Sequence, residues 1–214
     1  MTLDVTIIND QPIAAGFFGE GRWLTEFVTP SALDVKALHD ELVTSHMSLE
    51  DKIRTEWDWV ADRIQYVPFV RAQLEVNGKV SQQSDYWQLP SQLIQTRIGN
   101  CANKAFLLGS LVRNDLPSED VRVVFGNLFQ DGVPGGHAWV EARVDGQWLI
   151  LESTRGDMMP LVPTRVAEIY EPVMYFNDVG VIAIPGRTLL EPFSAVYADW
   201  LRDYLDWCYI EGRK

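Results

Sequence analysis

The chain has 214 residues, of which 47% are hydrophobic, and its eight tryptophans can contribute to a full hydrophobic core. This length and composition fit one globular domain and exclude extensive disorder. The formal net charge of −12 argues against nucleic acid and anionic membranes as partners, because both attract clustered lysine and arginine. We therefore expect a small molecule or a protein as the partner.

The N-terminus and the cysteines indicate the compartment. The first five residues include an acidic residue and no basic segment before an apolar core, so they do not resemble a signal peptide. No apolar run in the sequence is long enough to span a bilayer. Cys101 and Cys208 lie far apart and resemble neither a disulfide framework nor a pair of metal ligands. A reducing, cytoplasmic location is therefore expected.

The N-terminal third predicts one strand and two helices. Residues 5–8 form the strand, and the glycine-rich segment that follows, up to Gly21, is predicted as a loop. A capping pattern at residues 30–34 predicts the start of the first helix. Ser48, with Asp51 three residues later, starts the second helix, which is expected to end at residues 66–68. The apolar face of this second helix predicts a packing role, with Glu56 on another face.

The segment at residues 98–105 is the one around which we expect the fold to be organised. Residues 67–95 before it are polar and irregular, and are predicted to lack regular structure. Gly99 and Asn100 are typical turn and N-cap residues, and an apolar helix follows them to about Asn114. Because this helix is apolar on almost every side, we expect it to be buried. Cys101 then lies in its first turn, where unpaired amides and the helix dipole stabilise a thiolate and bind an oxyanion.

The C-terminal half predicts a sheet and a final helix. Residues 121–125 form a strand, residues 126–136 a loop, and His137 to Val144 a second strand. Asp145 and Gly146 predict a two-residue hairpin turn into a partner strand at residues 147–151. Two more strands are expected near residues 173–175 and 181–184, and a helix from residue 190. This helix would cover the core or a partner subunit.

The predicted hairpin brings a histidine and an acid together. If Val144 pairs with Gln147, the register places Trp139 opposite Glu152 and makes His137 a diagonal neighbour of Glu152. Diagonal neighbours lie roughly 7–8 Å apart at the backbone, so a carboxylate can reach the imidazole. With Cys101 nearby, these residues can act as nucleophile, base and orienting acid. Taken alone, however, a cysteine at a helix start is more often structural.

The motifs that carry these residues resemble those of the transglutaminase-like superfamily. They are Gly99-Asn100-Cys101 on a helix, His137-Ala138-Trp139-Val140-Glu141 on a strand, and Glu152-Ser153-Thr154 after the next strand. The resemblance implies an α+β, papain-like core in which a central cysteine-bearing helix packs on an antiparallel sheet, with extra N- and C-terminal helices. It covers about residues 48–156 of a single domain spanning 1–214, whose C-terminal strands and helix occupy 157–214. One departure is Glu152, since the family most often has aspartate there.

The resemblance also implies further site residues. The Cys101 amide is expected to donate to the oxyanion, and the second donor is either the Trp87 indole or the Gln88 amide. The alternatives, a core aromatic for Trp87 and a surface polar residue for Gln88, stay open. Trp139 is expected to pack on the sheet and to shield the His137 and Glu152 pair from water.

No cofactor or metal is expected, because the sequence contains neither His-Glu-x-x-His nor Cys-x-x-Cys. The family implies acyl transfer through a thioester on Cys101, with His137 as general base and acid and Glu152 orienting it. A cysteine peptidase or amidase acting on a protein, a peptide or a small amide is therefore the leading hypothesis. A transamidating cross-linker, a catalytically idle peptide-binding module, and self-association through the C-terminal helix remain alternatives.

Overall fold

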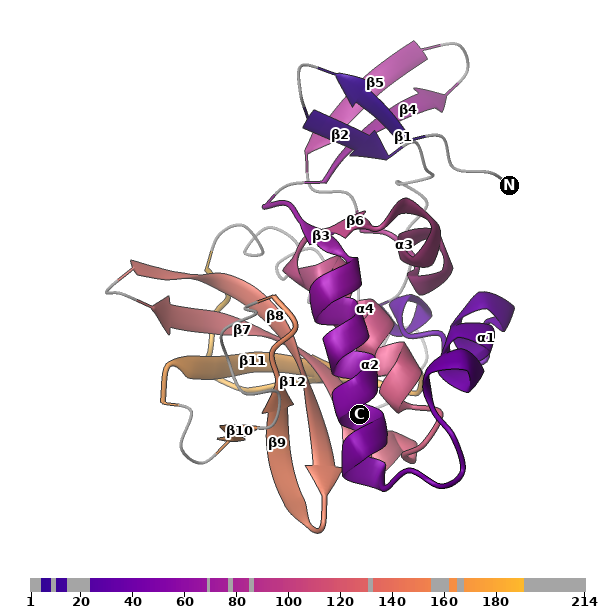
Figure 1. Ribbon diagram of the computed structural model, residues 1–214. Coiled ribbons are helices and arrows are strands. Elements are labelled where there is room, and N and C mark those ends of the chain that lie inside the picture. The colour runs from indigo at the N-terminus through magenta and orange to yellow at the C-terminus, as the bar shows by residue number, and fades with distance from the viewer. Residues whose placement is uncertain are drawn as a thin grey trace, which may run out of the picture.

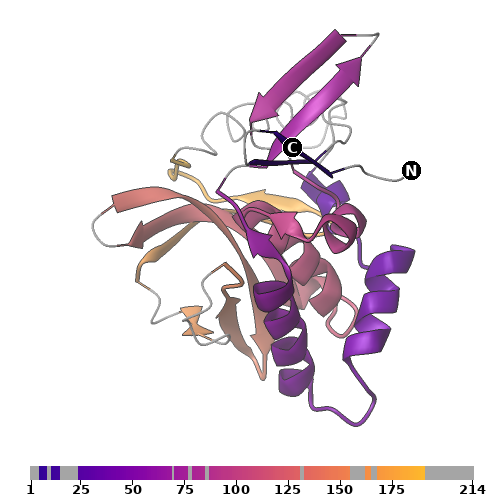
Figure 2. The same cartoon turned by 45° about the horizontal axis from the view of Figure 1, so that its top comes forward.

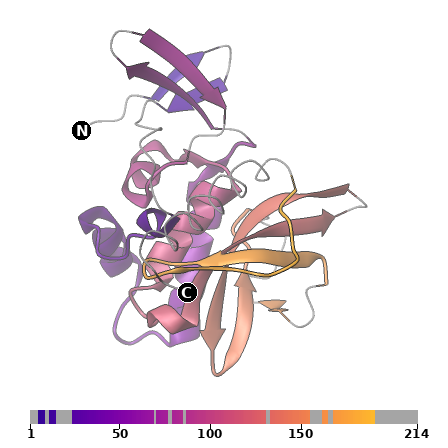
Figure 3. The ribbon, with the colours of Figure 1, turned by 180° about the vertical axis from the view of Figure 1, so that it is seen from behind.

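A computed structural model of the chain describes residues 5–8, 11–14, 24–68, 70–76, 79–84, 87–130, 133–154, 162–164 and 168–190. Helices occupy one side of the described structure and a six-stranded sheet the other, as the front and back views show (Figures 1 and 3). The mixed α+β fold predicted from the sequence is confirmed. Residues 191–214, which would carry nearly all of the predicted C-terminal helix and include Cys208, lie outside the described residues. The described residues contain no helix both long and apolar enough to cross a membrane.

The helices begin close to their predicted starts. Ser48 caps α2 by accepting a hydrogen bond from the Asp51 amide at 3.1 Å, as its sequence pattern predicts. By contrast, α1 has Ala32 at its N-cap, with no side-chain cap, so the predicted capping pattern is wrong. The helical elements are η1 (Leu24–Phe27), α1 (Leu33–Leu42), α2 (Leu49–Arg63), α3 (Pro90–Thr96), α4 (Cys101–Val112) and η2 (Ser118–Asp120).

The second helix ends earlier than predicted. α2 stops at Arg63 because Gln65–Tyr66 forms a short strand, β3, that pairs in parallel with β6 (Ile98–Gly99). This pairing places the end of α2 beside the segment that leads into Cys101. The prediction that Glu56 faces away from the packing side is also wrong, because Glu56 is completely buried.

Helix α4 is the centre of the fold, as its all-round apolar sequence predicts. Every residue from Cys101 to Val112 is buried. The helix contacts β7 and β8 of the large sheet on one side and α1, α2 and α3 on the others (Figure 1). Its two ends are therefore held by surrounding elements, which gives Cys101 a rigid support.

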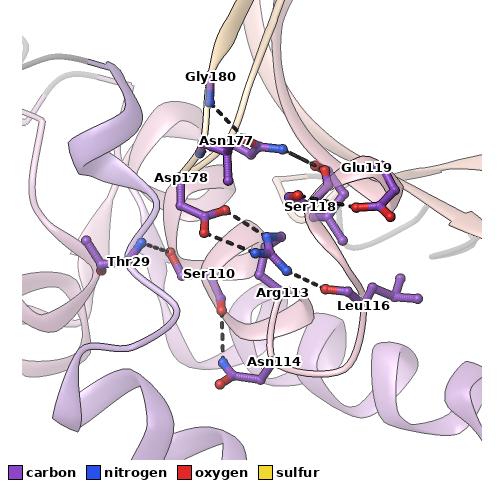
Figure 4. Close-up of polar contacts among 12 residues, drawn as sticks. Thr29, Ser110, Arg113, Asn114, Leu116, Ser118, Glu119, Asn177, Asp178 and Gly180 are labelled. Carbon is purple, nitrogen blue, oxygen red and sulfur yellow. Dashed lines mark hydrogen bonds and ion pairs between the residues drawn. The ribbon is translucent and has the colours of Figure 1, made fainter.

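Side-chain hydrogen bonds anchor the C-terminal end of α4 (Figure 4). Arg113 makes two hydrogen bonds with the Asp178 carboxylate, at 2.7 and 3.0 Å, and a third with the Leu116 carbonyl. Ser110 Oγ accepts a bond from the Thr29 amide at 2.8 Å. The end of the helix is thus joined to the turn after β11 and to the segment after η1.

The large sheet follows the order β10-β9-β8-β7-β11-β12 with antiparallel pairing throughout its described strands. The strands are β7 (Val121–Gln130), β8 (Val133–Val144), β9 (Gln147–Leu151), β10 (Val162–Pro163), β11 (Tyr170–Phe176) and β12 (Val181–Ala183). The predicted hairpin is confirmed, since Val144 pairs with Gln147 and positive φ angles occur at Asp145 (50°) and Gly146 (78°). The strands predicted near residues 173–175 and 181–184 are β11 and β12.

The loop predicted at residues 126–136 is wrong. Instead, β7 and β8 stay paired until Gln130 meets Val133. Pro134 cannot donate a backbone hydrogen bond, so it fits only where one side of a strand is unpaired. In the described residues, β9 pairs only with residues 140–144 of β8, so at Pro134 the strand has β7 as its one neighbour.

A smaller four-stranded sheet has the order β1-β2-β4-β5 and lies at one end of the molecule, where its β4–β5 hairpin points away from the helices (Figure 2). Its strands are β1 (Val5–Ile8), β2 (Gln11–Ala14), β4 (Arg71–Val76) and β5 (Lys79–Ser84). The strand predicted at residues 5–8 is confirmed, whereas the irregular structure predicted for 67–95 is wrong. The sequence does contain a signal for the β4–β5 hairpin. Asn77-Gly78, a dipeptide favoured in hairpin turns, lies between the two strands in the sequence.

Candidate active site

The N-terminus of α4 is shaped by a reciprocal cap. Asn100 Oδ1 accepts a hydrogen bond from the Asn103 amide at 3.1 Å, and Asn103 Oδ1 accepts one from the Asn100 amide at 3.3 Å. Gly99 is required beside them, because a Cβ there would lie 2.8 Å from both Asn103 and Leu93. The first intrahelical bond joins the Lys104 amide to the Asn100 carbonyl, so the Cys101 amide precedes the helical ladder. Cys101 therefore lies in the first turn of the helix, as predicted, and the role of its amide as an oxyanion donor stays a prediction.

The structure brings the three residues predicted as nucleophile, base and orienting acid together. His137 Nε2 lies 2.7 Å from Glu152 Oε2, and the Cys101 side chain lies close enough to His137 to raise the pKa of its imidazole. All three side chains are buried, with relative exposures of 7% for Cys101, 8% for His137 and 0% for Glu152. Because Nε2 is occupied by Glu152, Nδ1 is the ring nitrogen left to exchange a proton with Cys101.

The charges of this group favour an imidazolium. Burial alone lowers the pKa of His137, but the Glu152 carboxylate and the hydrogen bonds to Cys101 and Glu152 outweigh burial and raise this pKa to about 10. Burial acts to raise the pKa of Glu152, yet His137 and the hydrogen-bond donors around the carboxylate lower it overall. At neutral pH the pair is therefore an ionised imidazolium and carboxylate.

Glu152 is held by three residues that are not among those predicted for the site. Its Oε1 accepts from the Thr154 amide at 2.8 Å, and its Oε2 accepts from the Tyr170 hydroxyl at 3.0 Å. The Trp57 indole donates to the Glu152 carbonyl at 2.8 Å, so Trp57 has a positioning contact beyond its predicted packing role. With both oxygens occupied, the longer glutamate side chain is directed at His137.

Trp139 packs on the sheet as predicted. Trp139 is 1% exposed. Its ring lies nearly parallel to the His137 ring, with the two centroids 6.2 Å apart, and it contacts the Tyr170 ring edge to face. Its indole donates to Glu141 Oε1 at 3.1 Å, and Glu141 Oε2 accepts from Arg122 at 2.8 Å. The glutamate of the His-Ala-Trp-x-Glu motif thus orients the tryptophan, which covers one side of the imidazole.

Trp87 and Gln88, the two predicted candidates for the second oxyanion donor, both lie buried. The Trp87 ring packs against Phe27, Phe106 and Phe125 in the main core. The Gln88 side chain donates to the Ile98 carbonyl at 2.7 Å and accepts from the Thr96 hydroxyl at 2.6 Å, so the alternative of a surface residue is wrong. These contacts brace the segment before Cys101. The assignment of an oxyanion donor at either position stays a prediction.

A buried lysine lies one helical turn after Cys101. Lys104 Nζ donates to the carbonyls of Ala61 and Ile64 at 3.1 and 3.2 Å, which caps the C-terminal end of α2. Burial lowers its pKa to about 8, and the nearby Glu152 carboxylate opposes this effect. Lys104 therefore ties α4 to α2 close to the site.

Comparisons with known proteins agree with the fold of the chain. The family model of the transglutaminase-like superfamily matches residues 36–153, more than half of the chain. Among curated proteins, none matches the chain. Two solved structures of LapG from Legionella pneumophila resemble its fold. The EGTA-treated form has 18% identity and a TM-score of 0.53, covering 78% of this chain and 82% of LapG. The calcium-bound form has 17% identity and a TM-score of 0.52, covering 79% and 87%.

Proposed function

This chain belongs to the transglutaminase-like superfamily, and from that premise we propose that it is a cysteine peptidase or amidase. The observation that supports the proposal most strongly is that one buried imidazole bonds the Glu152 carboxylate and lies beside the Cys101 side chain at the start of α4. In this proposal Cys101 is the nucleophile, His137 is the general acid and base, and Glu152 orients His137.

The reaction begins with attack of the Cys101 thiolate on an amide carbonyl, which forms the S–C bond and places negative charge on the carbonyl oxygen. The Cys101 amide donates to this oxyanion. His137 Nδ1–H then protonates the leaving amine as the C–N bond breaks, and a thioester remains. Water attacks the thioester while His137 accepts its proton. Collapse of the second tetrahedral intermediate releases the acid and restores the thiolate and imidazolium.

Protonation of His137 supports this order of steps. An imidazolium with a pKa of about 10 is present before the substrate binds, so the proton for the leaving amine is already in place. The Glu152 carboxylate accepts hydrogen bonds from Thr154 and Tyr170, which keep it aligned with His137, so Glu152 does not need to move during the reaction. Burial of the group keeps bulk water away from the ion pair.

The test combines a peptide mixture with mass spectrometry of the products. The wild-type chain is expected to cleave amide bonds, and Cys101→Ala to lose the activity at least 1,000-fold, in line with loss of a covalent nucleophile. Cys208→Ser is the matched control, because it also removes one thiol but is expected to keep the activity. An acyl-enzyme adduct with the mass of the thioester, trapped at Cys101, would support the mechanism directly.

The same assay distinguishes the alternatives. Including a labelled amine with a glutamine-containing protein separates hydrolysis from transamidation, since incorporation of the amine would identify a cross-linker. Peptide binding without turnover, equal in the wild type and Cys101→Ala, would instead identify a binding module and refute the enzymatic proposal.

A further inference from the structure

A second cluster of ionisable side chains lies at the opposite end of α4 from Cys101. His39 belongs to α1, Glu56 to α2, and Asp115 follows the C-terminal end of α4. His39 Nδ1 lies 2.8 Å from Glu56 Oε1 and 3.9 Å from Asp115 Oδ2. One ligand atom from each residue lies within 4.8 Å of those of the other two. Three segments that are distant in sequence therefore converge on one point.

Two carboxylate oxygens in this cluster have no hydrogen-bond partner in the part of the chain that the structure describes. They are Glu56 Oε2 and Asp115 Oδ2, and both atoms are buried. Glu56 itself is 0% exposed, so bulk water does not reach it. Leaving a buried charged acceptor unsatisfied costs free energy, typically at least 1–3 kcal/mol. A bound cation would satisfy both oxygens at once.

The neighbouring cation does not fill this position. Lys52 Nζ bonds Asp115 Oδ1 at 2.5 Å, which leaves Oδ2 on the side of His39. One lysine therefore faces two carboxylates. Its contact with Asp115 resembles the hydrogen bonds that commonly orient a carboxylate ligand from outside a metal site.

The ligand types select the metal. One imidazole nitrogen with two carboxylate oxygens suits Zn²⁺ and related transition ions, whereas Ca²⁺ and Mg²⁺ prefer oxygen ligands alone. Tetrahedral zinc bonds of about 2.0–2.1 Å place ligand atoms about 3.3 Å apart. His39 Nδ1 lies 3.9 Å from the unpartnered Asp115 Oδ2 and 2.8 Å from Glu56 Oε1, the second oxygen of the carboxylate whose Oε2 is unpartnered, so these separations lie on either side of that value.

We propose that His39, Glu56 and Asp115 form a structural binding site for Zn²⁺ that joins α1, α2 and the C-terminal end of α4. The twelve residues of α4 are about 18 Å long, so this site is separate from Cys101 and does not depend on the proposed catalytic function. Three protein ligands leave one position for water or another small ligand.

The test measures zinc binding by isothermal titration calorimetry in a Cys101→Ser/Cys208→Ser background, because thiolates would bind zinc themselves. One equivalent of Zn²⁺ is expected to bind, with no binding of Ca²⁺. Saturating zinc is expected to raise the melting temperature by about 5–10 °C. Glu56→Gln, which keeps the side-chain shape, is expected to lose both effects.

His46→Ala is the matched control, because His46 is exposed and lies outside the cluster. It is expected to keep the full zinc response. Circular dichroism of metal-free Glu56→Gln checks that this variant folds, and Co²⁺ absorption in the background protein tests the site without altering its ligands. Absence of visible Co²⁺ bands and of stoichiometric zinc binding would overturn the proposal, as would equal zinc binding by folded Glu56→Gln.

Discussion

Replacing Glu152 by glutamine tests the ion pair with little change in shape. The carboxylate accepts bonds from His137, the Thr154 amide and the Tyr170 hydroxyl, all of which are donors. A glutamine offers one acceptor oxygen and one NH₂ group, so either orientation places a donor against a donor. The charge that stabilises the imidazolium is lost as well.

The expected loss of stability for Glu152→Gln is large. Removing one partner of a buried ion pair costs about 3–5 kcal/mol. For a chain of this size, 1 kcal/mol corresponds to roughly 2–4 °C in melting temperature, so a decrease of about 6–20 °C is expected.

The effect depends on pH in a defined direction. The pKa of His137 is raised from 6.5 to about 10 in the folded state, so its stabilising contribution is complete below pH 6.5 and is lost as pH rises towards 10. The pKa of Glu152 is lowered from 4.5, so its contribution is present above pH 4.5 and is lost in acid. The difference between wild type and Glu152→Gln is therefore expected to be greatest between about pH 4.5 and 6.5.

Urea denaturation followed by tryptophan fluorescence, at half-unit steps from pH 5 to 10, measures this difference. Glu168→Gln at an exposed position is the control, and its stability is expected to stay within about 0.5 kcal/mol of wild type. A difference for Glu152→Gln below 1 kcal/mol, or one that is equal at pH 6 and pH 10, would refute the reasoning.

Three further substitutions test the support of the site. Tyr170→Phe removes one hydrogen bond to the Glu152 carboxylate and should lower the unfolding free energy by about 1.5–3 kcal/mol in urea denaturation. Asn100→Ala removes the cap of α4 and should lower it by about 1 kcal/mol, measured by thermal denaturation. Gly126→Ala would place a Cβ 2.3 Å from a backbone oxygen and 2.4 Å from the Trp139 ring, and should cost about 1–3 kcal/mol in calorimetry. Wild-type stability in any of these variants would contradict the corresponding contact.

The central pair could be predicted because its geometry depends on local sequence. Asp145 and Gly146 specify a two-residue turn, and strand alternation then places His137 beside Glu152 without knowledge of the rest of the fold. The cap at Asn100 and the apolar sequence of α4 are equally local signals, and they placed Cys101 in a first helical turn.

The supporting residues depend on long-range pairing and could not be predicted in this way. Tyr170 reaches Glu152 because β11 pairs with β7, a neighbour more than 40 residues away in sequence. The three residues of the proposed zinc site come from separate segments, so no short motif marks them. Periodicity predicts a polar face for Glu56, because it cannot show that His39 of another helix satisfies one of the Glu56 oxygens.

The measurement that tests the central claim most directly is the rate of Cys101 alkylation by iodoacetamide at neutral pH. Wild type and His137→Ala are compared in the Cys208→Ser background, so that one thiol is followed. The protein with His137 is expected to react faster than His137→Ala, because a neighbouring imidazolium stabilises the thiolate that attacks the reagent. Equal rates in the two proteins, or no reaction in either, would contradict activation of Cys101 by His137.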